Sequence, residues 1–184
     1  MDTQAAVRYT IGECSLGLLL VAFGERGVCA ILLDDDREAL VQDLQRRFRR
    51  STLIECPLAG NPWFDKVRSS VEDPSQPLDA PLQLHGTPFQ QTVWQALLAI
   101  PPGTTSSYAE IARRIGAPTS SRAVGAAIAA NPLAVIVPCH RVLRSDGGLS
   151  GYRWGVARKR ALLDRGAGTA GERRRESLSP DLTR

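Results

Sequence analysis

The chain lacks any long apolar run. A helix that crosses a bilayer needs about 20 consecutive apolar residues, and the longest early run, Leu16–Phe23, covers only eight of the 184 residues. The run has no basic segment before it and no small-residue cleavage site after it, so it does not resemble a secretory signal. We therefore predict a cytoplasmic protein without a membrane partner, in which Leu16–Phe23 is a buried strand.

Cysteine and histidine are also scarce, with four and two residues respectively. No two cysteines form the close pair that is usual in zinc sites. Cys14, Cys29 and His85 could in principle share a metal, but they fall short of the usual four ligands. We predict no metal site. Free thiols then belong to the core, as we expect for Cys14, Cys29 and Cys56, or to chemistry, as we expect for Cys139.

The net charge of +4 is distributed unevenly along the chain. Residues 1–83 carry nine Lys or Arg against thirteen Asp or Glu, whereas residues 84–166 carry ten against three. A basic second half indicates a face that meets a polyanion, although a solvated basic surface would explain the same counts.

The first half favours an α/β fold, and we predict a domain over residues 1–80. Apolar runs around a glycine-bearing turn predict a hairpin, apolar periodicity predicts one helix, and Asn61-Pro62 is a typical start of another. A polar, proline-rich segment at residues 72–77 predicts a linker. The predicted strands are Leu16–Phe23 and Val28–Leu33, and the predicted helices are Arg37–Phe48 and Trp63–Val71.

The second half is predicted to be a mostly helical domain over residues 81–166. Thr87-Pro88 is a typical helix start, and two later helices, Tyr108–Ile115 and Ser120–Ala130, flank a short glycine-containing turn and predict a helix-turn-helix. The second of these is rich in Ala and Gly, which permits close packing inside the protein or close approach to a DNA groove. Residues 167–184 are predicted to be a disordered tail.

The segment Val135–Val142 contains the candidate for chemistry. It reads Val-Ile-Val-Pro-Cys-His-Arg-Val, an apolar, β-like run that ends in a rigid proline before Cys139 and His140. Only a thiolate is a good nucleophile, and an adjacent histidine with basic neighbours favours its formation. The alternative is a structural cysteine beside a surface histidine, which the Cys-His dipeptide alone does not exclude.

The flanking residues extend this motif. Pro138–Val142, Ser150–Gly155 and Arg158-Lys159 closely resemble the active-site region of the methylated-DNA–protein-cysteine methyltransferases, and Ile11–Gly17 with Trp154 resembles the repair half of Ada adaptive-response proteins. The resemblance implies a ribonuclease-H-like amino-terminal domain packed on a winged-helix-like carboxyl-terminal domain. Further matches lie at residues 89–94, 107–112, 121–125 and 130–132, so that the resemblance spans roughly residues 7–165.

The resemblance implies DNA repair by direct reversal of damage. Cys139 would take the alkyl group of O6-alkylguanine, and of O4-alkylthymine, irreversibly and once per molecule, while His140 draws off the thiol proton through a water. The partner would be double-stranded DNA that carries the lesion. Because the DNA supplies the alkyl group, neither a cofactor nor an obligatory protein partner is implied, and we expect a monomer.

Six further residues are implied in binding a flipped-out nucleotide. Arg122 would fill the vacated place in the base stack from the minor groove. Tyr108 would contact the phosphate 3′ to the lesion or donate a proton to the departing guanine, and Asn131 would brace the helix-turn-helix against the cysteine strand. The loop over the base would be lined by Ser145, Tyr152 and Arg153.

One position departs from the family pattern. The family carries a glutamate on the helix after the cysteine loop, where it accepts a hydrogen bond from the active-site histidine, and this chain has Gly166 there. Asp164 lies two residues away, which turns its side chain by about 200° around a helix. Loss of the group that orients a catalytic base lowers the rate, so we expect slower repair unless Asp164 or Glu172 reaches His140.

Three other functions remain as alternatives. A cysteine hydrolase needs a base from a distant part of the sequence, and only His85 is spare. A transcription factor would carry several base-reading side chains on its recognition helix, which offers little beyond Arg122. A lesion-binding relative that does not repair DNA would typically lack Cys139, but Gly166 keeps this alternative open.

Overall fold

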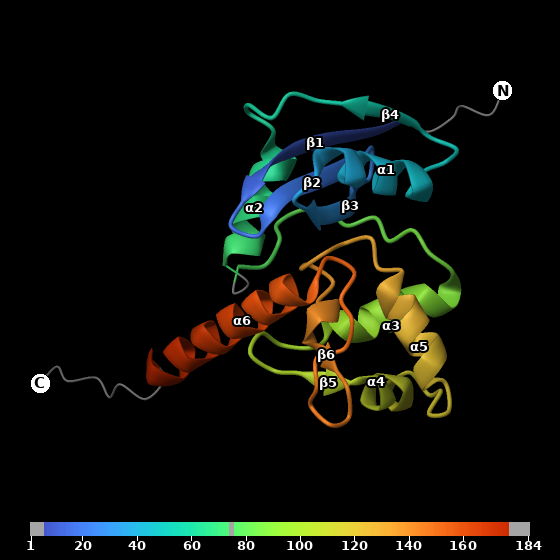
Figure 1. The fold of residues 1–184 in the computed structure, drawn as a ribbon, viewed down its shortest axis with the longest axis vertical. Helices are drawn as coiled ribbons and strands as arrows, with labels where there is room; N and C mark the ends of the chain where they lie inside the picture. The colour runs from blue at the N-terminus through green and yellow to red at the C-terminus, as the bar shows by residue number, and fades with distance from the viewer. Residues whose placement is uncertain (1–5, 74–75, 177–184) are drawn as a thin grey trace, which may run out of the picture.

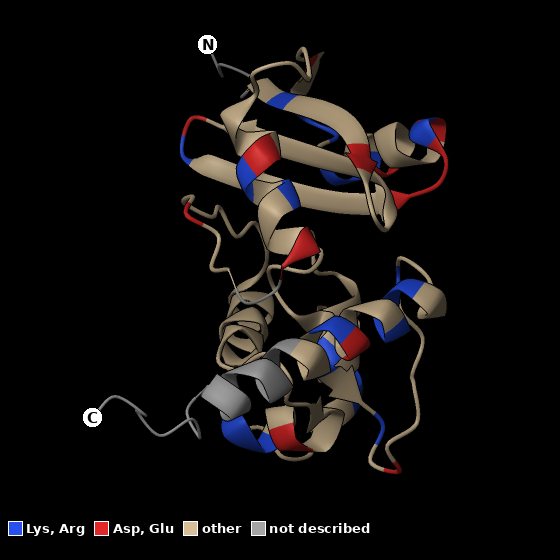
Figure 2. Cartoon of the chain, turned by 90° about the vertical axis from the view of Figure 1, so that its left-hand side faces the viewer, with Lys and Arg blue, Asp and Glu red and all other residues tan. Residues whose placement is uncertain are grey.

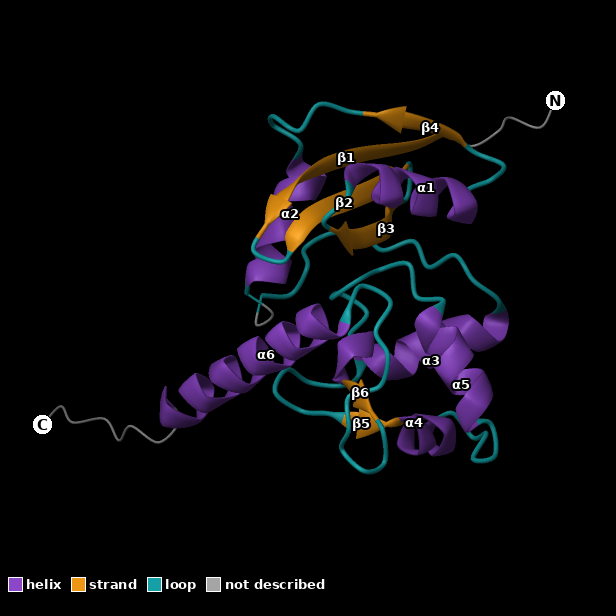
Figure 3. Cartoon of the chain, in the orientation of Figure 1, coloured by secondary structure: helices purple, strands orange, loops and turns teal. Residues whose placement is uncertain are grey.

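The computed structural model describes residues 6–73 and 76–176, and it places them in two units (Figure 1). The first unit is a sheet with two helices, and the second is mainly helical, as the colouring by secondary structure shows (Figure 3). Acidic residues lie on several elements of the first unit, whereas basic residues predominate on the second (Figure 2). No helix of the described residues is both long enough and apolar enough to cross a membrane.

A four-stranded sheet forms the body of the first unit. The strands are β1 (Ala6–Cys14), β2 (Gly17–Gly24), β3 (Gly27–Asp34) and β4 (Thr52–Glu55). Their order is β3-β2-β1-β4, with antiparallel pairing among the first three and β4 parallel to β1. The predicted hairpin is confirmed as β2 and β3. The edge strand β4 is mostly exposed, so its sequence carries no apolar pattern that would predict it.

Capping side chains set where the helices of the first unit begin. Asp36 caps α1 (Arg37–Arg47) and Asn61 caps α2 (Pro62–Glu72), each through an oxygen that accepts backbone N–H groups of the first turn. Both helices were predicted within about a residue. Helix α1 packs against β3, and α2 packs against β1 and β2.

Helices dominate the second unit. They are α3 (Pro88–Leu98), α4 (Tyr108–Arg114), α5 (Ser121–Ala129) and α6 (Val156–Glu176), joined by the 3-10 turn η1 (Cys139–Arg141) and the paired short strands β5 (Ser106–Ser107) and β6 (Val142–Leu143). The two helices predicted to flank a short turn are confirmed as α4 and α5, and both pack on α3. Trp94 of α3 donates from its indole nitrogen to the Ala127 carbonyl of α5 at 2.9 Å.

Two predictions about the second unit are wrong. The run before Pro138 is not a strand, because Val135 turns the chain with φ at 68°. Helix α6 continues to Glu176, ten residues into the stretch predicted as a disordered tail. Alanine, glutamate and arginine in residues 167–176 favour this continuation, because all three are good helix formers. The rest of that stretch, 177–184, lies outside the described residues.

The two units meet where the segment after α5 runs along the edge strand β3. The Ile31 N–H donates to the Pro132 carbonyl at 2.8 Å, and the Ala134 N–H donates to the Ile31 carbonyl at 2.9 Å. Arg158 of α6 adds a third link by donating to a backbone carbonyl of the first unit at 2.6 Å. The segment that leads to Cys139 is therefore attached to a rigid sheet.

Candidate functional site

Cys139 is the first residue of η1, directly after Pro138, and only 4 % of its surface is exposed. Four residues earlier, Val135 has a positive φ, a conformation that is strained for a β-branched side chain. Such strain persists only where the surroundings determine the backbone. The turn that presents the sulfur is therefore held by its neighbours and is not simply a favoured local shape.

The side chain of Asn131 supplies much of that support. It is fully buried, and its Nδ2 donates to the Val137 carbonyl at 3.0 Å and to the Leu133 carbonyl at 3.3 Å, while its Oδ1 accepts from the Leu133 N–H at 2.9 Å. The same Nδ2 lies 3.2 Å from Cys139 Sγ. Asn131 follows the cap of α5, so one carboxamide joins the end of that helix to the cysteine turn.

Lys159 is a functional candidate that the sequence reasoning missed. Only 1 % of it is exposed, and its Nζ donates to the Val142 carbonyl at 2.7 Å and to Ser150 Oγ at 3.0 Å. Ser150 Oγ in turn lies 2.6 Å from the Tyr108 hydroxyl, so a hydrogen-bonded chain joins Lys159 to Tyr108. The motif around Arg158-Lys159 was noticed, but nothing in it signals that this lysine is buried.

A small cavity of about 50 Å³ opens beside Cys139. A purine base is larger than this cavity, so a base that enters must displace part of the lining. The lining residues are Tyr108, Gly125, Ile128, Ala129, Cys139, Gly151, Tyr152, Arg153 and Trp154.

The other predicted site residues are placed differently. Arg122 is exposed on the first turn of α5. Arg153 lines the cavity but also pairs with Asp43 of α1 at 2.5 Å, which ties the loop to the first unit. Tyr152 packs edge-on against Trp154, with ring centroids 5.2 Å apart. Ser145 lies in an exposed turn and is not among the residues that line the cavity, so the structure does not bring it to Cys139.

Burial dominates the electrostatics of the site. It raises the pKa of the Cys139 thiol, and this effect is opposed by the hydrogen bond from Asn131 and by the positive charge of Lys159. Burial and the charge of Cys139 raise the pKa of the Tyr152 hydroxyl well above its usual value. This hydroxyl faces the sulfur but makes no hydrogen bond of normal geometry with a described residue. At neutral pH the resting site therefore holds a thiol.

His140 is neutral throughout the physiological range. Burial, together with the charges of Arg141 and Lys159, lowers its pKa to about 3. Among the described residues, neither ring nitrogen of His140 has a hydrogen-bond partner. A neutral imidazole can accept a proton, but no carboxylate is among the groups that shift the pKa of His140.

Gly166 lies on the face of α6 that packs against η1. It follows Lys159 and Leu162 at helical spacing, and all three are buried. A Cβ atom at Gly166 would lie 3.1 Å from the backbone nitrogen of Gly103, which is closer than most contacts of real Cβ atoms. Position 166 therefore lies against the backbone of the loop at Gly103, where a larger residue would need the loop to shift.

The fold and site together define a class: an α/β protein in which a buried, tightly held cysteine lies beneath the end of a helix-turn-helix. A model of the 6-O-methylguanine DNA methyltransferase DNA-binding domain matches residues 88–167. The inducible methylated-DNA–protein-cysteine methyltransferase of Bacillus subtilis is 42% identical over 127 residues, which cover 69% of this chain and 71% of that protein. The chain belongs to the methylated-DNA–protein-cysteine methyltransferase family.

Two further relatives extend the similarity to most of the chain. The bifunctional transcriptional activator/DNA repair enzyme Ada of Escherichia coli is 51% identical over 162 residues, or 88% of this chain and 46% of that protein. The crystal structure of Mycobacterium tuberculosis OGT in complex with DNA superposes with a TM-score of 0.71 at 37% identity, covering 88% of this chain and 93% of that one. The chain thus spans about half the length of the Ada protein it matches.

The buried, neutral His140 makes the fold sensitive to acid. Its pKa is about 3 in the folded chain and about 6.5 when unfolded, so the unfolded state binds more protons between these values. The stabilisation is complete above pH 6.5 and declines by about 1.4 kcal/mol per pH unit below it. Between pH 7 and pH 5 we expect a loss of about 2 kcal/mol in the free energy of unfolding.

Urea titrations at both pH values measure this loss, with His140→Gln as the matched variant that cannot titrate. The variant is expected to lose about 2 kcal/mol less than the parent over the same interval. Equal losses in the two proteins would show that His140 is already protonated, or accessible to water, in the folded state.

Proposed function

We propose that this protein repairs double-stranded DNA by transferring the alkyl group of O6-alkylguanine, and of O4-alkylthymine, to Sγ of its own Cys139. The observation that carries the proposal is the placement of Cys139: buried, held by Asn131, and open only to a cavity bordered by α5 and Tyr108. A thioether is not readily reversed, so each molecule acts once. The alkyl group comes from the DNA, so the reaction needs no cofactor.

The exposed face of α5 suits close contact with a DNA groove. Arg122, Ala123, Ala126 and Ala129 are all exposed, and their spacing places them along one side of the helix. Three of the four are alanines, which allow the backbone to approach the minor groove closely. Arg122 is the one long side chain among them, and in this proposal it occupies the place that the flipped nucleotide leaves.

The chemistry follows from the groups around the sulfur. The thiol proton passes to His140, directly or through a water, and the thiolate forms next to the positive charge of Lys159. A bond forms between Sγ and the alkyl carbon while the bond from that carbon to O6 breaks. Tyr108 donates a proton to the departing guanine and is resupplied along its hydrogen bonds to Ser150 and Lys159. In balance, the thiol loses one proton to His140, and guanine gains one that is drawn from Lys159 through Ser150 and Tyr108.

We also propose the finer description of the fold and its setting. The sheet order β3-β2-β1-β4, with a parallel edge strand, supports a ribonuclease-H-like first domain over residues 1–80. The compact group of α3, α4, α5 and the β5–β6 pair supports a winged-helix-like second domain over residues 81–166. The protein would act as a monomer in the cytoplasm, where one chain contains every group that the reaction uses.

Intact-protein mass spectrometry tests the proposed reaction directly. After incubation with an oligonucleotide duplex that carries one O6-methylguanine, the protein is expected to gain one methyl group, located by peptide mapping on Cys139. The Cys139→Ser variant is expected to gain none. Selective binding of the lesion without any mass gain would contradict the proposal and would identify the chain as a lesion-binding protein.

Restoring a carboxylate at position 166 tests the role of His140. Gly166→Glu is expected to raise the single-turnover rate of alkyl transfer, because a carboxylate stabilises the imidazolium that forms when the thiol loses its proton. The matched control is Gly166→Gln, which makes the same approach to Gly103 without the charge. A Glu variant no faster than the parent, or a Gln variant equally fast, would contradict a requirement for this charge.

Lys159→Met tests the electrostatic role of the buried lysine. Removal of the positive charge is expected to raise the pKa of Cys139 further and to lower the thiolate fraction at neutral pH by about tenfold per pKa unit. The pH dependence of Cys139 alkylation by iodoacetamide measures the shift, and Lys159→Arg, which keeps the charge, is the control. Identical pH profiles for the parent and the Met variant would assign Lys159 a packing role only.

A further inference from the structure

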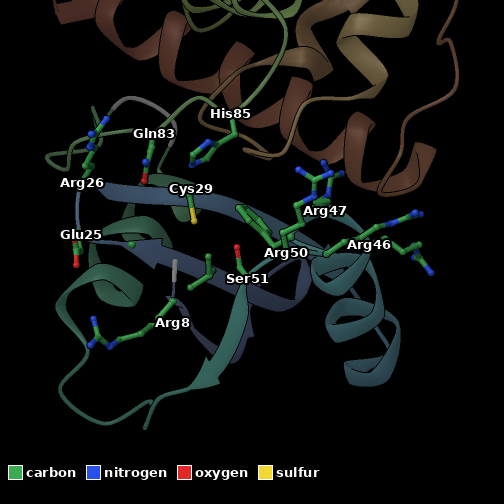
Figure 4. A pocket seen from close by; sticks show the side chains of 15 residues that line it. Arg8, Glu25, Arg26, Cys29, Arg46, Arg47, Arg50, Ser51, Gln83 and His85 are labelled. Carbon is green, nitrogen blue, oxygen red and sulfur yellow. The ribbon is translucent and has the colours of Figure 1, made fainter. Parts of the chain in front are cut away.

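A second cavity, which shares no lining residue with the one beside Cys139, lies on the first unit and the segment that follows it (Figure 4). Its volume is about 940 Å³, many times that of the cavity beside Cys139. Its walls come from four separate places: the start of β1, the turn between β2 and β3, the end of α1 with the residues that follow it, and the segment at residues 83–85. Nothing in the proposed reaction uses this cavity.

Positive charge predominates among the charged side chains that line the cavity. Six of its fifteen lining residues are arginines, namely Arg8, Arg26, Arg46, Arg47, Arg49 and Arg50, and Glu25 is the one acidic residue among them. Within the described part of the chain, four of these arginines, at positions 8, 26, 49 and 50, have no ion-pair partner, and the other two share Asp43. Six arginines against one carboxylate in one lining favour an anion with several charges.

One guanidinium in the wall is left partly unsatisfied. Arg47 is half-buried, and its Nη2 is buried without a hydrogen-bond partner among the described residues. A buried donor without a partner is costly, and a turn of the guanidinium toward the cavity would let a phosphate oxygen satisfy it. The fork of an arginine matches the oxygens of phosphate particularly well.

The cavity also adjoins the helix that is proposed to meet DNA. Arg47 Nη1 donates to the carbonyl of Ala130 at 3.3 Å, and Ala130 caps the carboxyl end of α5. Arg122 lies eight residues earlier, about 12 Å away along the helix axis. Successive phosphates of one DNA strand advance about 3.4 Å along the duplex, so this distance corresponds to roughly four base pairs.

We propose that this arginine-lined cavity binds the phosphate backbone of the same DNA duplex, a few base pairs from the lesion. The inference rests on the proposed function, because it takes a duplex on α5 as the ligand. Phosphate contacts fix the position of a protein on DNA without reading sequence. The first unit would thus make a second contact with the duplex, while α5 and the loop at residues 150–154 bind the damaged nucleotide.

Salt dependence of DNA affinity tests the proposal. The Arg49→Gln/Arg50→Gln double variant is measured on the full chain, in a Cys139→Ser background so that binding is not followed by transfer. The slope of log affinity against log salt is expected to decrease by about 1.8, or about 0.9 for each phosphate that the variant no longer neutralises. The matched control, Arg37→Gln/Arg68→Gln, removes two arginines of the same unit outside the cavity and is expected to leave the slope unchanged.

Two further arms decide the outcome. On a duplex trimmed to the base pairs beneath α5, parent and double variant are expected to bind alike, and with Cys139 restored both should transfer methyl at the same single-turnover rate on saturating DNA. An unchanged slope, an equal effect of the control variant, or a difference that persists on the trimmed duplex would overturn the proposal. The proposal would also be overturned if calorimetry showed that the cavity binds tripolyphosphate while the double variant and the parent had the same salt slope for DNA. Absence of methyl transfer in the parent would instead refute the proposed function. The two failures are distinguishable because the salt slope is measured in the Cys139→Ser background, where no transfer takes place.

Discussion

The carboxamide of Asn131 connects the parts of this protein that must act together. It bonds to both ends of the segment Leu133–Val137, whose strained turn at Val135 it helps to hold, and it reaches the sulfur of Cys139. Asn131 follows α5 directly, and the next residues pair with β3. The position of the sulfur relative to α5 and to the sheet therefore depends on one buried side chain with all its polar atoms in use.

Burial determines the resting chemistry of the site in the same way. It raises the pKa of Cys139 and lowers that of His140, so that both groups are neutral at pH 7. Lys159 introduces the positive charge that opposes the effect of burial on the thiol. His140 is thus a neutral proton acceptor next to Cys139 in the chain. Its ring nitrogens have no hydrogen-bond partner among the described residues, and position 166 is a glycine without a carboxylate.

The net charge of a segment does not show how its charged residues are distributed in the folded protein. Residues 1–83 carry nine basic against thirteen acidic residues, so the sequence pointed to the basic second half for a face that meets a polyanion. Six of the arginines in that first half nevertheless gather around one cavity, because strand β1, the β2–β3 turn and the end of α1 converge there. Their proximity follows from the order of strands in the sheet and not from their spacing along the chain.

Sequence alone determined the features that depend on neighbouring residues: the capped helix starts at Asn61 and Thr87, the apolar hairpin, and the family motif around Cys139. Tertiary structure decided the features that depend on packing between distant segments. Lys159 is buried in the folded chain, where its charge acts on the Cys139 thiol. The loop at Gly103 lies against Gly166, and Asp43 pairs with Arg153, 110 residues away. Local propensities carry no information about such contacts, because desolvation and ion pairing exist only once the two units have packed together.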